Sequence, residues 1–322
     1  MSKTNTRVTS GFDRESTAMD VVAGHDLSGR NAIVTGGSSG IGIETARALA
    51  SAGADVTLAV RDLAGGESVA REINAAIGSE RVHAARLDLS SLASVRAFAA
   101  AWGERPLSLL INNAGIMACP FSHTEDGFEM QFGTNHLGHF LLAHLLSPAL
   151  QRGAPSRVVA LSSSAHLYSD VHYDDIDYTA RAYDPFQAYG QSKTANALFA
   201  VEFDRRYRDR GIRAFSVMPG VINTGLARHL NPGDLEKMLA PSADDPRPYF
   251  FKNTGQGAAT SVWAAVGPEL DGHGGLYLEN CAEALPFGPD LPRGEGVKSW
   301  ALDPKSAARL WEISEARVGL AG

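Results

Sequence analysis

Residues 33–42 read IVTGGSSGIG, with a β-branched apolar run ahead of the glycines and an amphipathic segment after them. Glycine permits a tight turn and lets the backbone approach a pyrophosphate, and the first turn of the next helix offers free N–H groups and a positive dipole end. We therefore predict a strand–turn–helix that binds phosphate, in preference to a flexible turn without a ligand. The residues expected to hold the ligand are Gly36, Ser38, Ser39, Gly40, Ile41 and Gly42.

Apolar runs alternate with amphipathic stretches over most of the chain. The expected strands are residues 31–35, 56–60, 82–87, 107–112, 158–162 and 214–218. The expected helices are residues 41–52, 65–77, 92–102, 128–150 and 187–210. This alternation is typical of βαβ units, which form a parallel sheet covered by helices. We predict an α/β fold: a single-domain, Rossmann-type, doubly wound parallel sheet with helices on both faces.

The domain organisation follows from the absence of breaks in this pattern. The 322 residues contain no linker rich in Pro, Gly or Ser and no internal repeat, so one domain is expected over residues 29–322. Residues 1–28 have no sustained period and are predicted to form an N-terminal extension, either a tail or a segment packed on an edge of the fold. A short helix is expected around residues 16–23.

Composition excludes several classes of function. The net charge of −7 argues against binding to nucleic acid or to an anionic membrane, since both favour clustered Lys and Arg. No apolar run approaches the roughly 18 residues needed to span a bilayer, and residues 1–28 are unlike a signal peptide, so no membrane anchor is expected. Cys119 and Cys281 lack companions at metal-ligand spacing. We expect a cytoplasmic protein with no disulfide and no metal.

Tyr189 and Lys193 are the candidates for proton transfer. They lie four residues apart, which places both on one face of a helix. A free tyrosine has a pKa of about 10, and positive charge from Lys193 and from an oxidised nicotinamide is expected to lower the pKa toward the working range. Chance alone produces such a pair in roughly one chain of this composition in seven, so the pair needs its context.

Other polar side chains fall where they could assist. The run SSS at residues 162–164 ends an expected strand, at the sheet edge where ligands bind. One of these three hydroxyls could polarise a substrate carbonyl, and the others would have capping or turn roles. Asn135 lies within an expected helix, where an asparagine could also bond a backbone carbonyl at a kink. Packing is favoured over metal binding for three nearby histidines, His136, His139 and His144.

Several motifs together resemble the short-chain dehydrogenase/reductase family. TGGSSGIG, DL at residues 88–89, NNAG at residues 112–115 and PGVINT at residues 219–224 occur in the family's order. The strand ending SSSAH at residues 162–166 is similar to the branch of retinol dehydrogenases and WW-domain oxidoreductases. The resemblance covers about residues 30–280. It implies an NAD(P)-dependent oxidoreductase that acts on an alcohol or a carbonyl.

The resemblance also assigns roles to residues. Asn135 would order a water beside Lys193, completing a proton relay from Tyr189. The implied catalytic residues are Asn135, Ser163, Tyr189 and Lys193. The implied cofactor-binding residues are Gly36, Ser38, Ser39, Gly40, Ile41, Gly42, Arg61, Asp88, Leu89, Asn113, Ala114, Gly115, Tyr189, Lys193, Pro219, Gly220, Ile222 and Thr224.

The choice between cofactors depends on the end of the second expected strand. An acidic residue there would bind the ribose 2′-OH of NAD, whereas this chain has Val60 followed by Arg61. A guanidinium binds phosphate well, which favours NADP(H), and NAD(H) stays the alternative. Arg61 could instead pair with Asp62 or Glu67 on the surface.

The substrate is less well defined by sequence. Residues 219–252 occupy the place of the family's variable substrate loop, and their apolar character favours a lipophilic alcohol or ketone, with packing at a subunit interface as the alternative. The side chains concerned are Leu226, Leu230, Leu235, Met238, Leu239, Tyr249, Phe250 and Phe251. The 25 residues between Ser163 and Tyr189, which include residues 173–176, form a long interval as in the retinol-dehydrogenase-like branch and are expected to shape the substrate entrance.

Two other functions compete with this one. One is a C=C reductase of the protochlorophyllide-reductase type, and the other is a regulatory protein that binds NADP without turnover. The resemblance further implies a homodimer or homotetramer that pairs through residues 128–150 and 187–210.

Overall fold

The computed structural model describes residues 7–222, 224–227, 233, 240 and 246–320. Their centre is an eight-stranded sheet in the order β10-β9-β6-β5-β4-β1-β2-β3. All neighbours pair in parallel except β9 and β10, which are antiparallel. The strands are β1 (Asn31–Thr35), β2 (Asp55–Val60), β3 (Val82–Arg86), β4 (Leu109–Asn112), β5 (Ser156–Leu161), β6 (Ile212–Met218), β9 (Leu276–Glu279) and β10 (Ala282–Glu283); β7 (Val221–Ile222) and β8 (Phe251–Lys252) form a separate parallel pair.

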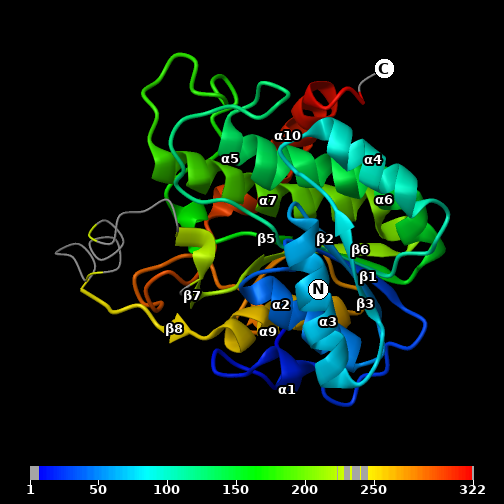
Figure 1. Ribbon diagram of the computed structural model, residues 1–322. Helices are drawn as coiled ribbons and strands as arrows, with labels where there is room; N and C mark the ends of the chain where they lie inside the picture. The colour runs from blue at the N-terminus through cyan, green and yellow to red at the C-terminus, as the bar shows by residue number, and fades with distance from the viewer. Residues whose placement is uncertain (1–6, 223, 228–232, 234–239, 241–245, 321–322) are drawn as a thin grey trace.

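Helices cover both faces of the sheet, as Figure 1 shows with one layer above the strands and one below. One layer packs Trp263, Leu49 and Ile73 against the sheet, and the other packs Phe132, Phe140 and Phe203. The first contains α1 (Ala18–Val22), α2 (Ile41–Ser51), α3 (Leu63–Ile77) and α9 (Thr254–Val266). The second contains α4 (Leu92–Trp102), α5 (Met130–Phe132), α6 (Gly138–Arg152), α7 (Pro185–Tyr207) and α10 (Pro304–Arg317). The predicted doubly wound fold is confirmed.

The strand order creates the crevice in which such folds bind ligands. β1 pairs with β2 on one side, through Ala32 and Val56, and with β4 on the other, through Ala32 and Leu109. The strand order therefore reverses at β1: β2 and β3 lie on one side of it, and β4, β5 and β6 lie on the other. Loops after β1 and β4 diverge at this point, which opens a space beyond the carboxyl ends of the strands.

The N-terminal segment packs on an edge of the sheet. Thr9 forms an antiparallel bridge with Ala282 of β10, and the Glu283 N–H donates to Val8 O. α1 then packs against α9 on one face of the sheet. Residues 1–28 were expected to be either a tail or a segment packed on an edge of the fold, and their described part packs on the edge. It forms hydrogen bonds with backbone groups of β10 that would otherwise lack a partner strand.

Several parts of the chain differ from the expected elements, and helices α9 and α10 and the strand pair β7 and β8 were not predicted. The helix expected over residues 128–150 is divided: α5 runs into a π-helical turn, η1 (Gly133–Leu137), before α6 begins. The sheet also continues through β9 and ends in antiparallel β10, neither of which was predicted. These strands have only four and two residues, so they are too short for their periodicity to stand out.

Candidate functional site

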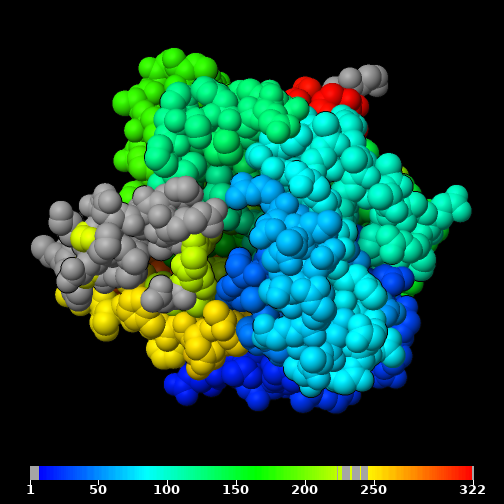
Figure 2. Space-filling model, viewed as in Figure 1, coloured from blue at the N-terminus to red at the C-terminus, as the bar shows by residue number. Residues whose placement is uncertain are grey.

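A cavity of about 710 Å³ lies beyond the carboxyl ends of β1 to β6. In Figure 2 it corresponds to the hollow on the viewed face between the blue N-terminal part of the chain and the lime segment near residues 221–226. Its wall contains most of the residues that the sequence singled out: Gly36, Ser38, Ser39, Gly40, Ile41, Arg61, Asp88, Leu89, Asn113, Ala114, Gly115, Ser163, Tyr189, Lys193, Pro219, Gly220, Ile222 and Thr224. Gly42 and Asn135 do not line it.

The glycine turn has the geometry that a phosphate requires. Gly36 and Gly40 have φ values of +63° and +56°, in the left-handed region that favours glycine. Gly40 is the N-cap of α2, and no side chain caps the first turn of this helix. The N–H groups of that turn lie at the cavity and are available to an anion. The cradle therefore fits the pyrophosphate of a dinucleotide.

Gly42 has a packing role instead of a contact with the cavity. A Cβ at this position would lie 2.6 Å from Gly36 O and 2.7 Å from Asn113 Nδ2. The third glycine therefore lets α2 approach the turn closely. The expectation that Gly42 faces the ligand is wrong, because the residue points back toward β1 and β4.

The turn after β4 is locked to the turn after β1. Thr35 Oγ1 accepts hydrogen bonds from the N–H groups of Asn113 and Ala114, both at 2.9 Å, and Asn113 Nδ2 donates to Thr35 O at 2.7 Å. His139 contacts Thr35 Oγ1 at 2.8 Å from the α6 side. These contacts fix the position of the turn after β4 relative to the turn after β1.

Arg61 is exposed and lines the cavity directly after β2. Neighbouring Asp62 is the N-cap of α3 and accepts from the Gly65 N–H at 3.2 Å. Within the described residues, Arg61 forms no ion pair with Asp62 or Glu67, the surface partners that the sequence offered. The guanidinium is therefore placed to meet a ligand at this end of the cavity.

Tyr189, Lys193 and Ser163 meet at the opposite end. Tyr189 and Lys193 lie one turn apart on α7 and are 4% and 3% exposed. Ser163 follows β5, and its side chain lies near enough to the Tyr189 phenol to lower the pKa of that group. Lys193 Nζ donates to Leu161 O at 3.0 Å and lies 5.5 Å from the centroid of the Tyr189 ring. The sequence predicted this grouping, and the fold produces it.

Burial controls the ionisation of both groups. It raises the pKa of Tyr189 to about 12, and the side chain of Ser163 opposes this rise. Burial also lowers the pKa of Lys193 to about 8. In the protein without cofactor, the loss of hydration dominates the pKa of Tyr189. The lowering expected from Lys193 together with an oxidised nicotinamide stays a prediction for the enzyme with bound cofactor.

Asn135 lies behind the cavity wall, in the π-helical turn η1. Its Nδ2 donates to Ile116 O at 3.0 Å and to Ser192 Oγ at 2.9 Å, and its Oδ1 accepts from the Ile116 N–H at 2.9 Å. A Cβ at Gly115 would lie 3.3 Å from Asn135 Oδ1 and 3.4 Å from Lys193 Nζ. Asn135 and Lys193 therefore both lie close to Gly115, but of the two only Lys193 lines the cavity.

The apolar part of the cavity includes side chains that sequence reasoning missed. The missed side chains are Met117 and Tyr168, between the main helices and strands, and Phe186, in the first turn of α7. Tyr249, Phe251 and Leu226 of the expected substrate loop line the same cavity. Tyr168 is 50% exposed and Phe251 is 54% exposed. Isolated aromatic residues in loops carry no period, so only their place in the fold identifies them. Other predicted positions lie outside the described residues: Asn223, Leu230, Leu235, Met238 and Leu239.

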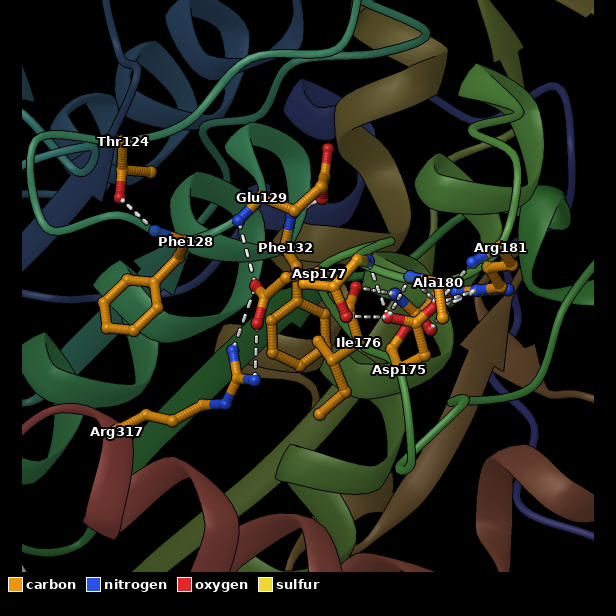
Figure 3. A network of polar contacts seen from close by, with 12 residues as sticks. Thr124, Phe128, Glu129, Phe132, Asp175, Ile176, Asp177, Ala180, Arg181 and Arg317 are labelled. Atoms are coloured by element: carbon orange, nitrogen blue, oxygen red, sulfur yellow. Dashed lines mark hydrogen bonds and ion pairs between the residues drawn. The ribbon is translucent and has the colours of Figure 1, made fainter.

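Within the interval between Ser163 and Tyr189, Ser164, Ala165, Tyr168 and Phe186 line the cavity, whereas residues 173–176 do not. Figure 3 shows what this region does instead: Asp175 accepts hydrogen bonds from the backbone of Ala180 and Arg181, and Asp177 pairs with Arg317 of α10 at 2.6 Å. Asp177 also accepts from the Glu129 N–H at 3.0 Å. The segment fastens α10 to the start of α5.

Metal-binding clusters and membrane-spanning helices are both absent from the described residues. No group of three or more His, Cys, Asp or Glu side chains there could hold a metal ion, and the histidines pack as expected, with His136 bonded to Ser314 Oγ at 2.8 Å. No helix of the described chain is long and apolar enough to cross a bilayer.

The fold and the cavity define an oxidoreductase of the Rossmann type. The short chain dehydrogenase profile matches residues 30–235. A "Probable oxidoreductase" of Streptomyces lividans is 48% identical over 89% of this chain and 97% of that protein. Retinol dehydrogenase 12 of Mus musculus is 41% identical over 91% of this chain and 88% of its own. A Pseudomonas aeruginosa RhlG/NADP complex has a TM-score of 0.61 and 29% identity over 79% of this chain and 95% of that one.

The chain therefore belongs to the short-chain dehydrogenase/reductase family, as its motifs predicted. Its relatives include retinol dehydrogenases at about 40% identity, the branch that SSSAH at residues 162–166 indicated.

Proposed function

We propose that the protein catalyses reversible hydride transfer between a nicotinamide cofactor and the carbonyl or alcohol carbon of a lipophilic small molecule. One observation carries the proposal: Ser163, Tyr189 and Lys193 lie on the wall of the same cavity as the glycine turn, with Ser163 beside the Tyr189 phenol. A proton donor and a carbonyl-polarising group thus face the space where a dinucleotide fits.

A nicotinamide dinucleotide supplies or accepts the hydride when it is bound. The glycine turn and the first turn of α2 would hold its pyrophosphate. Asp88 and Leu89 would contact the adenine, and Asn113 to Gly115 would form the floor of the groove. The nicotinamide end would meet Pro219, Gly220, Ile222 and Thr224, which line the other end of the cavity.

The chain's own residues handle the substrate oxygen and its proton. Ser163 Oγ accepts from the Ala165 N–H at 3.2 Å, so its own O–H can be donated to the substrate oxygen. Tyr189 gives its phenolic proton to that oxygen in reduction and takes it back in oxidation. Lys193 orients the ribose and supplies positive charge near the phenol. Asn135, next to Lys193, anchors the water that returns the proton from solvent.

NADP(H) is the proposed cofactor, and NAD(H) is the alternative. Arg61 supports this choice because it lines the cavity after β2 and forms no ion pair within the described residues. A guanidinium would bind the 2′-phosphate with two parallel hydrogen bonds. We further propose a cytoplasmic location, which suits a chain of 322 residues with only two cysteines, Cys119 and Cys281.

The test follows the absorbance of NADPH and of NADH with a panel of lipophilic aldehydes, ketones and alcohols. Turnover is expected with NADPH, and Tyr189→Phe is expected to lower kcat by roughly 100-fold or more, because it removes the acid–base group. Arg61→Ala should raise KM for NADPH by about tenfold or more and leave KM for NADH unchanged. Binding of cofactor without turnover, or turnover that Tyr189→Phe leaves intact, would overturn the proposal.

A further inference from the structure

Behind Ser163 lies a pair of buried side chains to which the proposed reaction gives no role. His166 is in the 3₁₀ turn η2 (Ser164–Leu167), and Tyr277 is on β9; they are 0% and 1% exposed. Their ring centroids are 4.8 Å apart, and Tyr277 Oη lies 3.0 Å from His166 Nδ1. Neither residue lines the cavity, and both contact the carbonyl group of Ser163.

Three donors converge on this carbonyl oxygen. Ser163 O lies 2.7 Å from His166 Nδ1, 3.1 Å from Tyr277 Oη and 3.1 Å from the His166 N–H. A carbonyl oxygen has two lone pairs, so its capacity to accept hydrogen bonds is used in full. The peptide plane after Ser163 is therefore held from two elements, the turn that follows β5 and the strand β9.

The contacts on the far side of His166 fix its tautomer. The Lys298 N–H donates to His166 Nε2 at 3.2 Å, so this nitrogen carries the lone pair. Burial lowers the pKa of His166 to about 4, which keeps the ring neutral. A neutral imidazole with a free Nε2 carries its proton on Nδ1, the atom that faces Ser163 O. The Trp300 indole N–H bonds to His166 O at 3.2 Å and holds the same turn.

We propose that His166 and Tyr277 are positioning residues that fix the backbone of Ser163, so that its hydroxyl stays aimed at Tyr189 and the substrate oxygen. Through Lys298 and Trp300, they also make the geometry of the catalytic serine depend on the C-terminal segment. The inference rests on the proposed function, because it gives His166 and Tyr277 a task only if Ser163 acts on substrate.

Tyr277→Phe tests the pair with the smallest change, since it removes one hydroxyl. We expect kcat to fall by about 3- to 10-fold, the effect of one lost hydrogen bond, with KM for NADPH unchanged. Tyr173→Phe is the matched control: it removes an equivalent hydroxyl-to-carbonyl bond, to Ser306 O at 2.9 Å, at a site away from the cavity, and its kcat should equal that of the unaltered enzyme.

His166 is tested with a pair of variants. His166→Leu removes both ring nitrogens, whereas His166→Asn retains an N–H donor near the place of Nδ1. We expect kcat to fall in His166→Leu and to be partly restored in His166→Asn. In alcohol oxidation, the midpoint of the pH–kcat profile should also move to higher pH in Tyr277→Phe and His166→Leu, because a loosened Ser163 no longer helps to lower the pKa of Tyr189.

A purely structural role predicts different results. If Tyr277→Phe and His166→Leu lose activity only in proportion to the fraction of folded protein, and the midpoint of the pH–kcat profile does not move, the inference is overturned. The proposed function would still stand in that case. Absence of all turnover in the unaltered enzyme would overturn both. If His166→Leu fails to fold, Tyr277→Phe still decides the matter through its kcat and its pH midpoint.

Discussion

Lys193 illustrates how a single side chain balances burial against charge. An ammonium has three N–H donors, and within the described residues Leu161 O is the acceptor that one of them reaches. The shortage of acceptors and water is why burial lowers the pKa of Lys193 to about 8. In the enzyme without cofactor, the Lys193 ammonium is therefore mostly charged only below pH of about 8.

This titration predicts a pH dependence for cofactor capture. Lys193 is charged below pH of about 8 and becomes neutral above it, so the contact with the ribose that its charge strengthens is lost as pH rises. We expect kcat/KM for NADPH, which reports groups of the free enzyme, to fall above pH of about 8. This fall is measured by determining kcat/KM at a series of pH values with NADPH as the varied substrate.

Lys193→Arg is the control for this assignment, because a guanidinium keeps its proton throughout this range. Its rate should be lower at every pH, since the larger group fits the buried site poorly, and the inflection near pH 8 should disappear. An inflection that persists in Lys193→Arg would assign the titration to another group.

At the scale of elements, the turn between β1 and α2 shows that a phosphate cradle depends on close packing. Gly42→Ala should place a methyl group against Gly36 O and Asn113 Nδ2, and both neighbours belong to the walls of the crevice. We expect about 1–3 kcal/mol lost from the free energy of unfolding and at least tenfold weaker NADPH binding. Denaturant titration and NADPH fluorescence measure the two effects.

Gly11→Ala supplies the matched control, because no heavy atom lies within 4 Å of a Cβ at that position. It should change neither quantity. Equal NADPH affinity in Gly42→Ala and the unaltered chain would show that the close approach of α2 is unnecessary for binding.

The elements also show where sequence reasoning succeeds and where it stops. The glycine turn, NNAG and the Tyr–Lys spacing are local patterns, and each predicted its place because βαβ geometry brings the carboxyl ends of strands together. Asn135 was predicted as a mid-helix residue, but the π-helical turn that carries it depends on contacts with Ile116 and Ser192 from elsewhere in the chain. Tyr277 was missed because its strand has four residues and its partners lie more than 100 positions away.

On the scale of the whole molecule, α10 occupies the face through which the subunits were expected to pair. Trp311 is 2% exposed, and its ring lies 4.8 Å from that of Phe140 on α6 and 6.3 Å from that of Phe199 on α7. Residues 188–200 of α7 are buried without exception. Asp177, paired with Arg317, fastens the end of α10. Pairing through α6 and α7 would require α10 to leave.

We therefore expect the purified chain to sediment as a monomer of 34.1 kDa, in place of the homodimer or homotetramer that the resemblance implied. Sedimentation velocity tests this directly. Trp311→Ala should cost about 3–5 kcal/mol in the free energy of unfolding, measured in urea, because it empties the contact that covers both helices. A dimer or tetramer of the unaltered chain would contradict the expectation.

The bond between His166 and Lys298 has a consequence for the order in which the protein is made. A nascent chain that has just passed Thr224 already contains every residue proposed for catalysis and cofactor binding. The ribosome has not yet added β9, with Tyr277, or the backbone of Lys298 that fixes the His166 ring. On the inference above, the Ser163 backbone is therefore fixed only after the ribosome has added β9 and Lys298, and full turnover is expected only from that point.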